Sequence, residues 1–400
     1  MFGFGVMTGT SADGVDVSLL SFPGEIDEEA GIFSGGWSFP FPDGVREKIL
    51  EMQENPAPSK ESLLRFSVEY GFLVGECVRT VLEKLAPGRV RREESFVAMH
   101  GQTIGHYPGA WEREGSPMTL TFQSGSPQAV SFVTGLTVVS DFRAMDVVSG
   151  GRGAPLAPLY HRTLLRREKG VTAFLNVGGI ANVTVVEKGE VLLATDTGPG
   201  NMLIDGAVRI LSGGEEFFDR DGRRAASGTF SPQLQMFIEK RDPLLSRGLP
   251  ATAGREDYGE RFLREIMDES RRLKLSGEDL LCTLTRYTAR CVRKALERGG
   301  LSPAKVYVGG GGAWNETLMR FLRKELSPAE VTTSEALGIP PQFVESSAFS
   351  FLGARALAGI PSRMERVTGG GTVILGTITP GENFVPLMER VRARRRFGGE

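Results

Sequence analysis

The chain is poor in the residues that bind metals or form disulfides. It contains three cysteines and three histidines in 400 residues, and the cysteines form no CxxC pair. Disulfide frameworks and zinc sites need several such residues at short spacing, so we expect a reducing compartment. His100 and His106 lie six residues apart across a predicted turn, which is poor geometry for a metal and better suits contact with a polar ligand or a structural hydrogen bond.

The chain also lacks an excess of charge and a long apolar run. It carries 47 basic and 49 acidic residues, a formal net charge of −2, whereas binding to nucleic acid or anionic membrane calls for a basic surplus. No run of about 18 apolar residues occurs, and the N-terminus has no charged region ahead of an apolar one. We therefore expect a soluble cytoplasmic protein that binds neither nucleic acid nor membrane.

Three familiar motifs are absent as well. No GxxxxGK[ST] occurs, which excludes a Walker-type NTPase. The Gly3-Phe-Gly5 stretch lacks the third glycine of a dinucleotide fingerprint and leads to a strand instead of a helix. No GxSxG segment fits a serine nucleophile.

Glycine, in contrast, is abundant, with 52 residues. An apolar run over residues 2–7 enters a turn of small residues at 8–14, and an alternating run at 15–22 leaves it, which predicts strand, turn and strand. Such a turn lets backbone N–H groups converge on a phosphate. Asp13 and Asp16 would repel phosphate but suit a Mg²⁺ ion beside it. An ordinary β-hairpin with a polar tip is the alternative.

The same pattern recurs later in the chain. Three short runs, AFLNVGG, ANVTVVEKG and EVLLATDTG, repeat the order of strand, glycine turn and strand, which suggests an internal repeat. Asp196 ends the third run and opens a helix, a position suited to a general base or simply to a helix cap. The glycines at 309–312 follow a strand and could lie against a flat adenosine, or form a flexible turn.

Strands alternate with helices along the chain, which predicts an α/β architecture. We expect residues 141–158 to form a long irregular connection at a domain boundary, and residues 217–254 to form a lid or surface excursion. Apart from the runs above, the predicted strands are 95–99, 118–122, 136–140, 305–308 and 372–375. The predicted helices are 44–54, 59–85, 127–134, 199–211, 257–273, 279–298, 314–324 and 345–358.

Together these turns resemble the two-lobed sugar kinase, actin and heat-shock ATPase superfamily. Within it, nine ordered blocks between residue 3 and about residue 380 resemble the anhydro-N-acetylmuramic acid kinase family. The blocks are 5–16 (GVMTGTSADGVD), 100–103 (HGQT), 140–146 (SDFRAMD), 150–156 (GGRGAPL), 176–182 (NVGGIAN), 196–201 (DTGPGN), 218–222 (FDRDG), 310–315 (GGGAWN) and 338–341 (GIPP).

The resemblance implies an actin-like or hexokinase-like fold with a central interdomain cleft, and a homodimer. Domain I would be residues 1–140 with 366–400 returning to it, and domain II residues 141–365. The implied reaction uses ATP, Mg²⁺ and water to convert 1,6-anhydro-N-acetylmuramic acid to N-acetylmuramic acid 6-phosphate in peptidoglycan recycling.

The resemblance also implies roles for residues. Asp196 corresponds to the catalytic base. The nucleotide-binding residues would be Gly9, Thr10, Ser11, Ala12, Asp13, Gly14, Val15, Asp16, Gly178, Gly179, Gly310, Gly311 and Gly312, with Mg²⁺ near Asp13 and Asp16. The candidate sugar contacts are Glu345, Asp141, Arg143, Asp146 and His100.

The chain departs from the family pattern at Thr8, Ala12, Arg152 and Thr197, of which Arg152 adds a charge that leaves substrate detail open. Two other functions are alternatives to the implied kinase reaction. A hexokinase-like enzyme would phosphorylate a free amino sugar, and an actin-like ATP switch would bind a protein.

Overall fold

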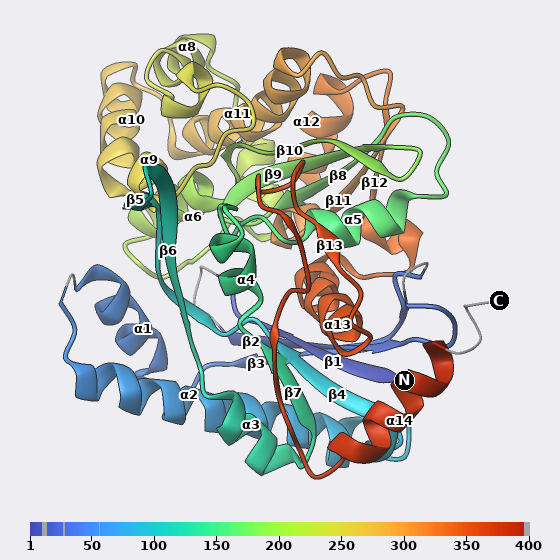
Figure 1. Ribbon diagram of the computed structural model, residues 1–400. Helices are drawn as coiled ribbons and strands as arrows, with labels where there is room; N and C mark the ends of the chain where they lie inside the picture. Colours follow the sequence, from blue (N-terminus) through green and yellow to red (C-terminus); the bar gives the residue numbers. More distant parts are fainter. Residues whose placement is uncertain (10–13, 27–28, 56, 396–400) are drawn as a thin grey trace. The chain divides into compact units, whose positions relative to one another are not determined.

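The computed structural model describes residues 1–9, 14–26, 29–55 and 57–395 (Figure 1). It divides into two compact units, Met1–Leu164 with Glu345–Glu400, and Leu165–Val344. Each unit contains a β-sheet and its own helices, so the predicted mixed α/β architecture is confirmed. No helix among the described residues is both long enough and apolar enough to cross a membrane.

The strands of the first unit are β1 (Phe2–Met7), β2 (Gly14–Ser21), β3 (Ile32–Pro40), β4 (Ser95–Met99), β5 (Gln102–Arg113), β6 (Ser116–Ser124), β7 (Thr137–Ser140), β13 (Ser362–Arg363), β14 (Thr372–Val373) and β15 (Thr377–Thr379). Its helices are α1 (Val45–Glu54), α2 (Lys60–Thr80), the π-helical η1 (Val81–Leu85), η2 (Arg92–Glu94), α3 (Pro127–Thr134), α4 (Phe142–Val148), α5 (Pro158–Leu165), α13 (Val344–Leu357) and α14 (Phe384–Arg395).

The strands of the second unit are β8 (Thr172–Val177), β9 (Ile180–Glu187), β10 (Glu190–Pro199), β11 (Lys305–Gly309) and β12 (Glu330–Thr333). Its helices are α6 (Met202–Leu211), η3 (Arg220–Gly222), α7 (Arg223–Ser227), α8 (Pro232–Glu239), η4 (Pro243–Ser246), α9 (Arg255–Tyr258), α10 (Glu260–Arg272), α11 (Gly277–Arg298), η5 (Gly311–Trp314), α12 (Glu316–Glu325), η6 (Ser334–Leu337) and η7 (Pro341–Phe343).

The two sheets share a five-stranded topology, to which the first sheet adds the antiparallel edge strand β15. The first has the order β15-β7-β4-β1-β2-β3, and the second the order β10-β9-β8-β11-β12. Along the chain, each sheet begins with three consecutive antiparallel strands, β1–β3 in the first sheet and β8–β10 in the second. Two later strands then run parallel to the opening strand: β4 and β7 in the first sheet, and β11 and β12 in the second. The internal repeat expected from the glycine turns is therefore present in the fold. In each unit the first strand ends at the carboxyl edge of the parallel strands.

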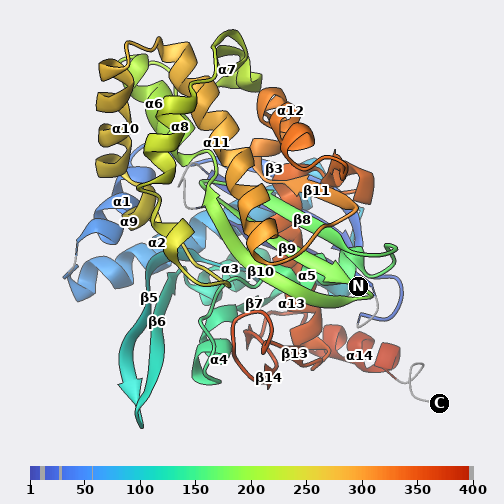
Figure 2. The same cartoon turned by 90° about the horizontal axis from the view of Figure 1, so that it is seen from above.

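Helices cover the faces of the first sheet. Figure 1 shows α2 and α3 along one face, where Phe66, Tyr70 and Val74 of α2 join the core formed by β1 and β2. Ser59 caps α2 by accepting a hydrogen bond from the backbone N–H of Ser62, which satisfies one of the free donors of a helix start. Residues 102–124, partly expected as a strand, form a long β5–β6 ribbon (Figure 2).

Helix α13 packs closely against β1 because two glycines make room for it. A Cβ atom at Gly5 would overlap the backbone oxygen of Ser346. The hydroxyl of Ser350 donates to the backbone oxygen of Gly3 at 2.9 Å. The start of α13, with Glu345, is thereby held against the first sheet.

In the second unit, α11 and α12 cover the sheet. Ala289 and Val292 of α11 and Leu318 of α12 share a core with Val306 and Val308 of β11. Ser276 and Asp279 form a capping box at the start of α11, as expected for a long helix that begins after a loop.

Two expectations about irregular segments are wrong. Residues 142–148 form α4 within the segment expected to be irregular, and residues 217–254 contain α7, α8 and η4 instead of a lid. The apolar residues Leu234, Ile238 and Leu244 of this second segment are buried in a helical core with α10 and α11. Short helices broken by Gly and Pro bury these side chains without a long periodic pattern, which is why the sequence did not indicate them.

The limits of the compact units differ from the expected domain boundaries. The first unit extends to Leu164 instead of 140 and resumes at Glu345 instead of 366. The first unit resumes as early as Glu345 because α13 packs on β1. Further along, β15 pairs antiparallel with β7, so the C-terminal segment lies in the first unit.

Candidate functional site

In the first unit, the expected site residues gather at one edge of the sheet. Strands β1, β4 and β7 are parallel, so their carboxyl ends share that edge. Gly9 follows β1, His100 follows β4 and Asp141 follows β7. Polar groups at the carboxyl ends of parallel strands are how open α/β sheets present a ligand site.

Three of the expected sugar contacts form a connected cluster there. Arg143 Nε donates to His100 Nε2 at 2.9 Å, and the ring of Phe349 lies 4.7 Å from that of His100. Burial lowers the pKa of His100 well below its usual value, and the charge of Arg143 lowers it further, so the imidazole is neutral. Burial also lowers the pKa of Arg143 to about 10, against the opposing charge of Glu345. Arg143 therefore remains cationic near neutral pH.

His106 lies beside the same cluster. Its Nδ1 is 3.0 Å from Thr121 Oγ1 on the neighbouring strand β6. Burial and the nearby charge of Arg143 lower its pKa to about 4. No group of three or more His, Cys, Asp or Glu among the described residues is arranged to hold a metal.

The structure describes only part of the hairpin that was predicted to bind phosphate. The predicted order of strand, turn and strand is confirmed, and the antiparallel β1–β2 pairing runs from Phe2 with Ser21 to Met7 with Asp16. Tyr70 of α2 donates its hydroxyl to Thr8 at 2.8 Å and anchors the start of the turn. The predicted contacts Thr10, Ser11, Ala12 and Asp13 lie outside the described residues.

Asp16, at the base of this hairpin, is oriented by the next strand. Ser38 Oγ of β3 donates to Asp16 Oδ1 at 2.5 Å. Val15, between Gly14 and Asp16, is buried in the core and so fixes the strand that carries this carboxylate.

Asp146 has contacts that fit a structural role. Its side chain has no exposed surface. One oxygen accepts from the backbone N–H of Gly153 at 2.7 Å, and the other accepts from Thr368 Oγ1 at 2.6 Å. These bonds hold the glycine-rich loop after α4, and we therefore leave Asp146 out of the sugar contacts proposed below.

In the second unit, the two glycine turns and the Asp196 strand end lie at one edge of the sheet. The backbone N–H of Gly200 donates to the oxygen of Gly179 at 2.9 Å, and that of Asn201 donates to the oxygen of Gly178 at 2.8 Å. A Cβ atom at Gly200 would overlap the Gly178 oxygen. The turn after β8 and the end of β10 therefore form one bonded unit.

The late glycine loop joins the same edge. Gly310 has a left-handed φ of 78°, and a Cβ there would lie 2.6 Å from the backbone oxygen of Val177. Its N–H donates to the oxygen of Pro341 at 2.9 Å. Gly310 and Gly312 thus lie directly against Val177 at the end of β8, a close approach of two backbones that side chains would block.

Asp196 sits immediately before an irregularity in β10. Asp196 pairs with Asn182, and Gly198 pairs with Ala181, so Thr197 is an extra residue in the strand. Such bulges re-aim side chains next to functional sites. Asp196 is half-buried, and its Oδ2 accepts from the backbone N–H of Ala253 at 2.8 Å. A fixed carboxylate at a strand end is suited to proton abstraction.

A buried polar group that the sequence did not reveal supports this strand end. Asp242 is 6% exposed and accepts hydrogen bonds from the hydroxyls of Tyr258 and Tyr287. Cys291 lies beside it, and a Cβ at Gly198 would be 2.9 Å from the Cβ of Cys291. Nothing in the sequence links these residues, because they come from segments expected to be a lid and a plain helix.

Comparison with known proteins identifies the family. The family model for anhydro-N-acetylmuramic acid kinase matches residues 1–381. The chain belongs to the anhydro-N-acetylmuramic acid kinase family. A relative of that name from Caldanaerobacter subterraneus subsp. tengcongensis is 33% identical over 383 residues, which cover 94% of this chain and 96% of the relative. Another relative of that name, from Streptomyces coelicolor, is 36% identical over 388 residues, which cover 96% of this chain and 95% of the relative.

The likeness to solved structures is weaker than the likeness to members of the family. A ROK family glucokinase from Streptomyces griseus, solved with glucose and AMPPNP, is 10% identical, covers 88% of this chain and 97% of that chain, and has a TM-score of 0.38. The family assignment therefore stands on the sequence relatives.

Proposed function

We propose that this protein is an ATP-dependent kinase that converts 1,6-anhydro-N-acetylmuramic acid and water to N-acetylmuramic acid 6-phosphate in peptidoglycan recycling. The observation that carries the proposal is the family match over residues 1–381. The Asp196 strand end supports it, because the substrate's O6 is tied up in the anhydro bridge and a base is needed to open that bridge.

In the proposed reaction, a water oxygen bonds to C1 while the C1–O6 bond breaks. The Asp196 carboxylate takes the proton from that water and later passes it to solvent. The released O6 bonds to the γ-phosphorus of ATP as the bond to the ADP oxygen breaks. The hydrogen bond from Ala253 N–H to one Asp196 oxygen orients the carboxylate for this role.

We assign the remaining residues by their geometry. Arg143, cationic near neutral pH, suits the lactyl carboxylate of the sugar, and Glu345, Asp141 and His100 suit its polar groups. Neutral His100 holds the Arg143 side chain in place. Gly178 and Gly179 suit phosphate oxygens, and the Gly310 to Gly312 backbone suits the adenosine.

Magnesium fits the residues at the hairpin. Mg²⁺ keeps several waters and binds through one or two carboxylates together with substrate phosphates. Asp16, oriented by Ser38, supplies one such carboxylate next to the phosphate turn, and we propose that it holds the ion directly or through water. When bound, the ion offsets phosphate charge. Asp16→Asn should raise the Mg²⁺ concentration that gives half-maximal rate, and an unchanged requirement would argue against this assignment.

We also propose that the protein is a cytoplasmic homodimer. The need for ATP supports the cytoplasm. An exposed apolar stripe on α2, formed by Leu64, Val68 and Phe72, supports self-association, because large exposed apolar patches mark interfaces. Light scattering on the wild type and on Leu64→Glu should show a dimer and a monomer, respectively; a monomeric wild type would contradict the proposal.

The function is tested by ADP release on three sugars in parallel. We expect rapid ATP-dependent turnover of 1,6-anhydro-N-acetylmuramic acid and far slower turnover of free N-acetylmuramic acid and N-acetylglucosamine. Preference for a free sugar would favour the hexokinase-like alternative. ATP-dependent sedimentation without turnover of any sugar would favour the actin-like switch.

A further inference from the structure

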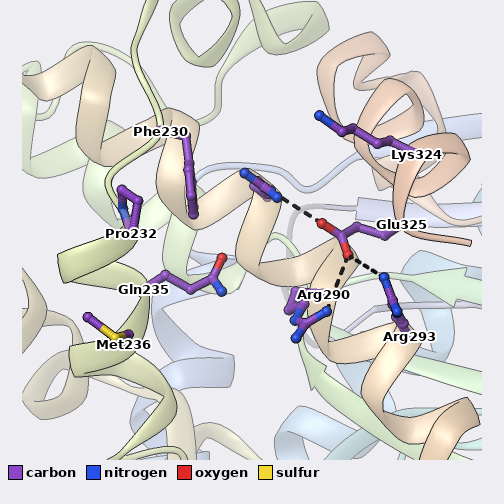
Figure 3. Close-up of a pocket in the computed structure, with 9 residues that line it drawn as sticks. Phe230, Pro232, Gln235, Met236, Arg290, Arg293, Lys324 and Glu325 are labelled. Carbon is purple, nitrogen blue, oxygen red and sulfur yellow. Dashed lines mark hydrogen bonds and ion pairs between the residues drawn. The ribbon is translucent and has the colours of Figure 1, made fainter.

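A cavity of about 380 Å³ in the second unit lies outside the residues assigned above (Figure 3). It is bounded by α8, α11 and α12. Its charged lining consists of Arg286, Arg290 and Arg293 on α11 and Lys324 and Glu325 on α12. A volume of a few hundred Å³ is the size of a small-molecule site.

The cavity has more positive than negative charge. The side chain of Glu325 is 6% exposed and faces all three arginines, with N···O distances of 3.3 Å to Arg286, 3.6 Å to Arg290 and 3.7 Å to Arg293. Figure 3 shows this carboxylate facing Arg290 and Arg293. One carboxylate cannot neutralise three guanidinium groups.

Neighbouring carboxylates do not remove the excess. Glu297 pairs with Arg293, while Glu239 pairs closely with Lys294 and lies 3.8 Å from Arg290. Lys324 forms no ion pair with any residue that the structure describes. Five cationic side chains thus share three carboxylates, which leaves the equivalent of two positive charges for a ligand. A phosphate monoester carries nearly that charge with opposite sign at neutral pH.

Two buried polar atoms of lining residues lack hydrogen-bond partners within the described part of the chain. They are Arg290 Nε, a donor, and Gln235 Oε1, an acceptor. Buried polar atoms without partners are uncommon and call for an explanation. A ligand that offers both an anionic oxygen and a hydroxyl would satisfy both atoms.

The opposite wall is apolar. Phe230, Pro232 and Met236 line it, and the guanidinium of Arg286 lies 4.0 Å from the centre of the Phe230 ring. That stacking fixes Arg286 in place, and the apolar wall suits the carbon skeleton of a ring.

We propose that this cavity binds a phosphate monoester of a small hydroxylated ring compound, either a sugar phosphate or a nucleoside monophosphate, and that its occupancy alters turnover. The phosphate meets Arg290 and Lys324, a hydroxyl donates to Gln235, and the ring lies along Phe230. The site is separate from the residues of the proposed reaction. Binding of the ester does not depend on that reaction, whereas the effect on turnover rests on the proposed function.

Helix α11 connects the cavity to the Asp196 strand. Its arginines line the cavity, while Thr288 on the same helix donates to the backbone oxygen of Gly200 at 3.0 Å. Cys291 of this helix packs against Gly198. A ligand that shifts α11 therefore acts directly on the strand end that carries Asp196.

The test measures calorimetric binding of glucose 6-phosphate, AMP and inorganic phosphate to the full-length protein. We expect at least one ester to bind more tightly than inorganic phosphate, with the better ester distinguishing a sugar from a nucleoside source. Lys324→Glu and Arg290→Gln should weaken that binding by about tenfold or more, as loss of a charge-assisted hydrogen bond does. The control Arg261→Gln removes a cation whose side chain is 95% exposed and should change nothing.

Several results would overturn the proposal. Absence of binding by all three probes would do so, and so would equal affinity in the wild type and both cavity variants, which would place the ligand elsewhere. If Arg290→Gln fails to fold, Lys324→Glu alone decides, because Lys324 forms no ion pair with a described residue. Wild-type turnover unaffected by a saturating bound ester would refute the link through α11.

Discussion

At the scale of the residue, the proposed reaction depends on the carboxylate of Asp196. The Asp196→Asn variant keeps an oxygen that can accept from Ala253 N–H, so the loop and the nucleotide contacts should survive. Removal of the base should lower kcat by about 10³-fold, within the range for general bases. Steady-state ADP release and ATP-analogue binding measure the two effects separately. Asp268→Asn on the surface of α10 is the matched control; a kcat for Asp196→Asn near that of the control would remove Asp196 from the mechanism.

The cysteines allow a second residue-level prediction. Cys77, Cys282 and Cys291 are all buried, and burial raises the pKa of Cys77 to about 12 and that of Cys291 well above its usual value. Since only the thiolate reacts, the native protein should release almost no thionitrobenzoate from Ellman's reagent, and three equivalents after denaturation. Rapid reaction of any thiol in the folded protein would contradict this burial.

At the scale of the element, the contact between β1 and α13 holds Glu345 against the first sheet. A methyl group at Gly5 would overlap the Ser346 carbonyl, and overpacking costs about 1–3 kcal/mol of unfolding free energy. Gly5→Ala should therefore lower the midpoint of urea unfolding. Gly248→Ala, where a methyl group would meet no atom within 4 Å, should leave it unchanged. Equal midpoints for the two variants would show that α13 can move away freely.

Helices and strands were predictable from the sequence where apolar residues recur at a regular spacing or where turn residues mark both ends. The helix at residues 127–134 and the strand at 95–99 have their predicted limits. Pro127 and Gly135 mark the two ends of the helix, and the strand consists of five consecutive buried residues. Helix α4 was missed, because it follows Asp141, a residue in the left-handed conformation, and is only two turns long.

The candidate site was predictable where a motif lies on a strand end, as at His100, Asp196 and Gly310. It was not predictable where the support comes from tertiary contacts. The Asp242 group with Tyr258 and Tyr287, and the burial of Asp146 against Thr368, join residues that are far apart in the sequence. The basic cavity likewise depends on the packing of three helices, which no spacing in the sequence reveals.

At the scale of the whole molecule, buried neutral histidines should make the protein sensitive to acid. Burial lowers the pKa of His161 to about 3 and contributes most to lowering that of His106 to about 4. The pKa of an unfolded histidine is about 6.5. As the pH falls from 6.5 toward the folded pKa values, His106 and His161 therefore bind protons in the unfolded chain but not in the folded chain. Stability should therefore fall as the pH drops below 6.5, by on the order of a few kcal/mol in total.

Urea unfolding at pH 4.5, 5.5 and 7 measures this loss. The variant His161→Leu, which cannot take up the proton, should show a shallower dependence on pH than the wild type. Identical slopes would show that His161 does not contribute to the loss.

The central claim is that phosphoryl transfer is coupled to hydrolytic opening of the anhydro bridge. Turnover of 1,6-anhydro-N-acetylmuramic acid with ATP in ¹⁸O-labelled water tests it most directly. Mass spectrometry should find one ¹⁸O at the C1 hydroxyl of the sugar product and none in its phosphate, beyond the slow anomeric exchange of unlabelled product kept in the same water. A phosphorylated product without ¹⁸O at C1 above that exchange, or with ¹⁸O in its phosphate, would contradict the account.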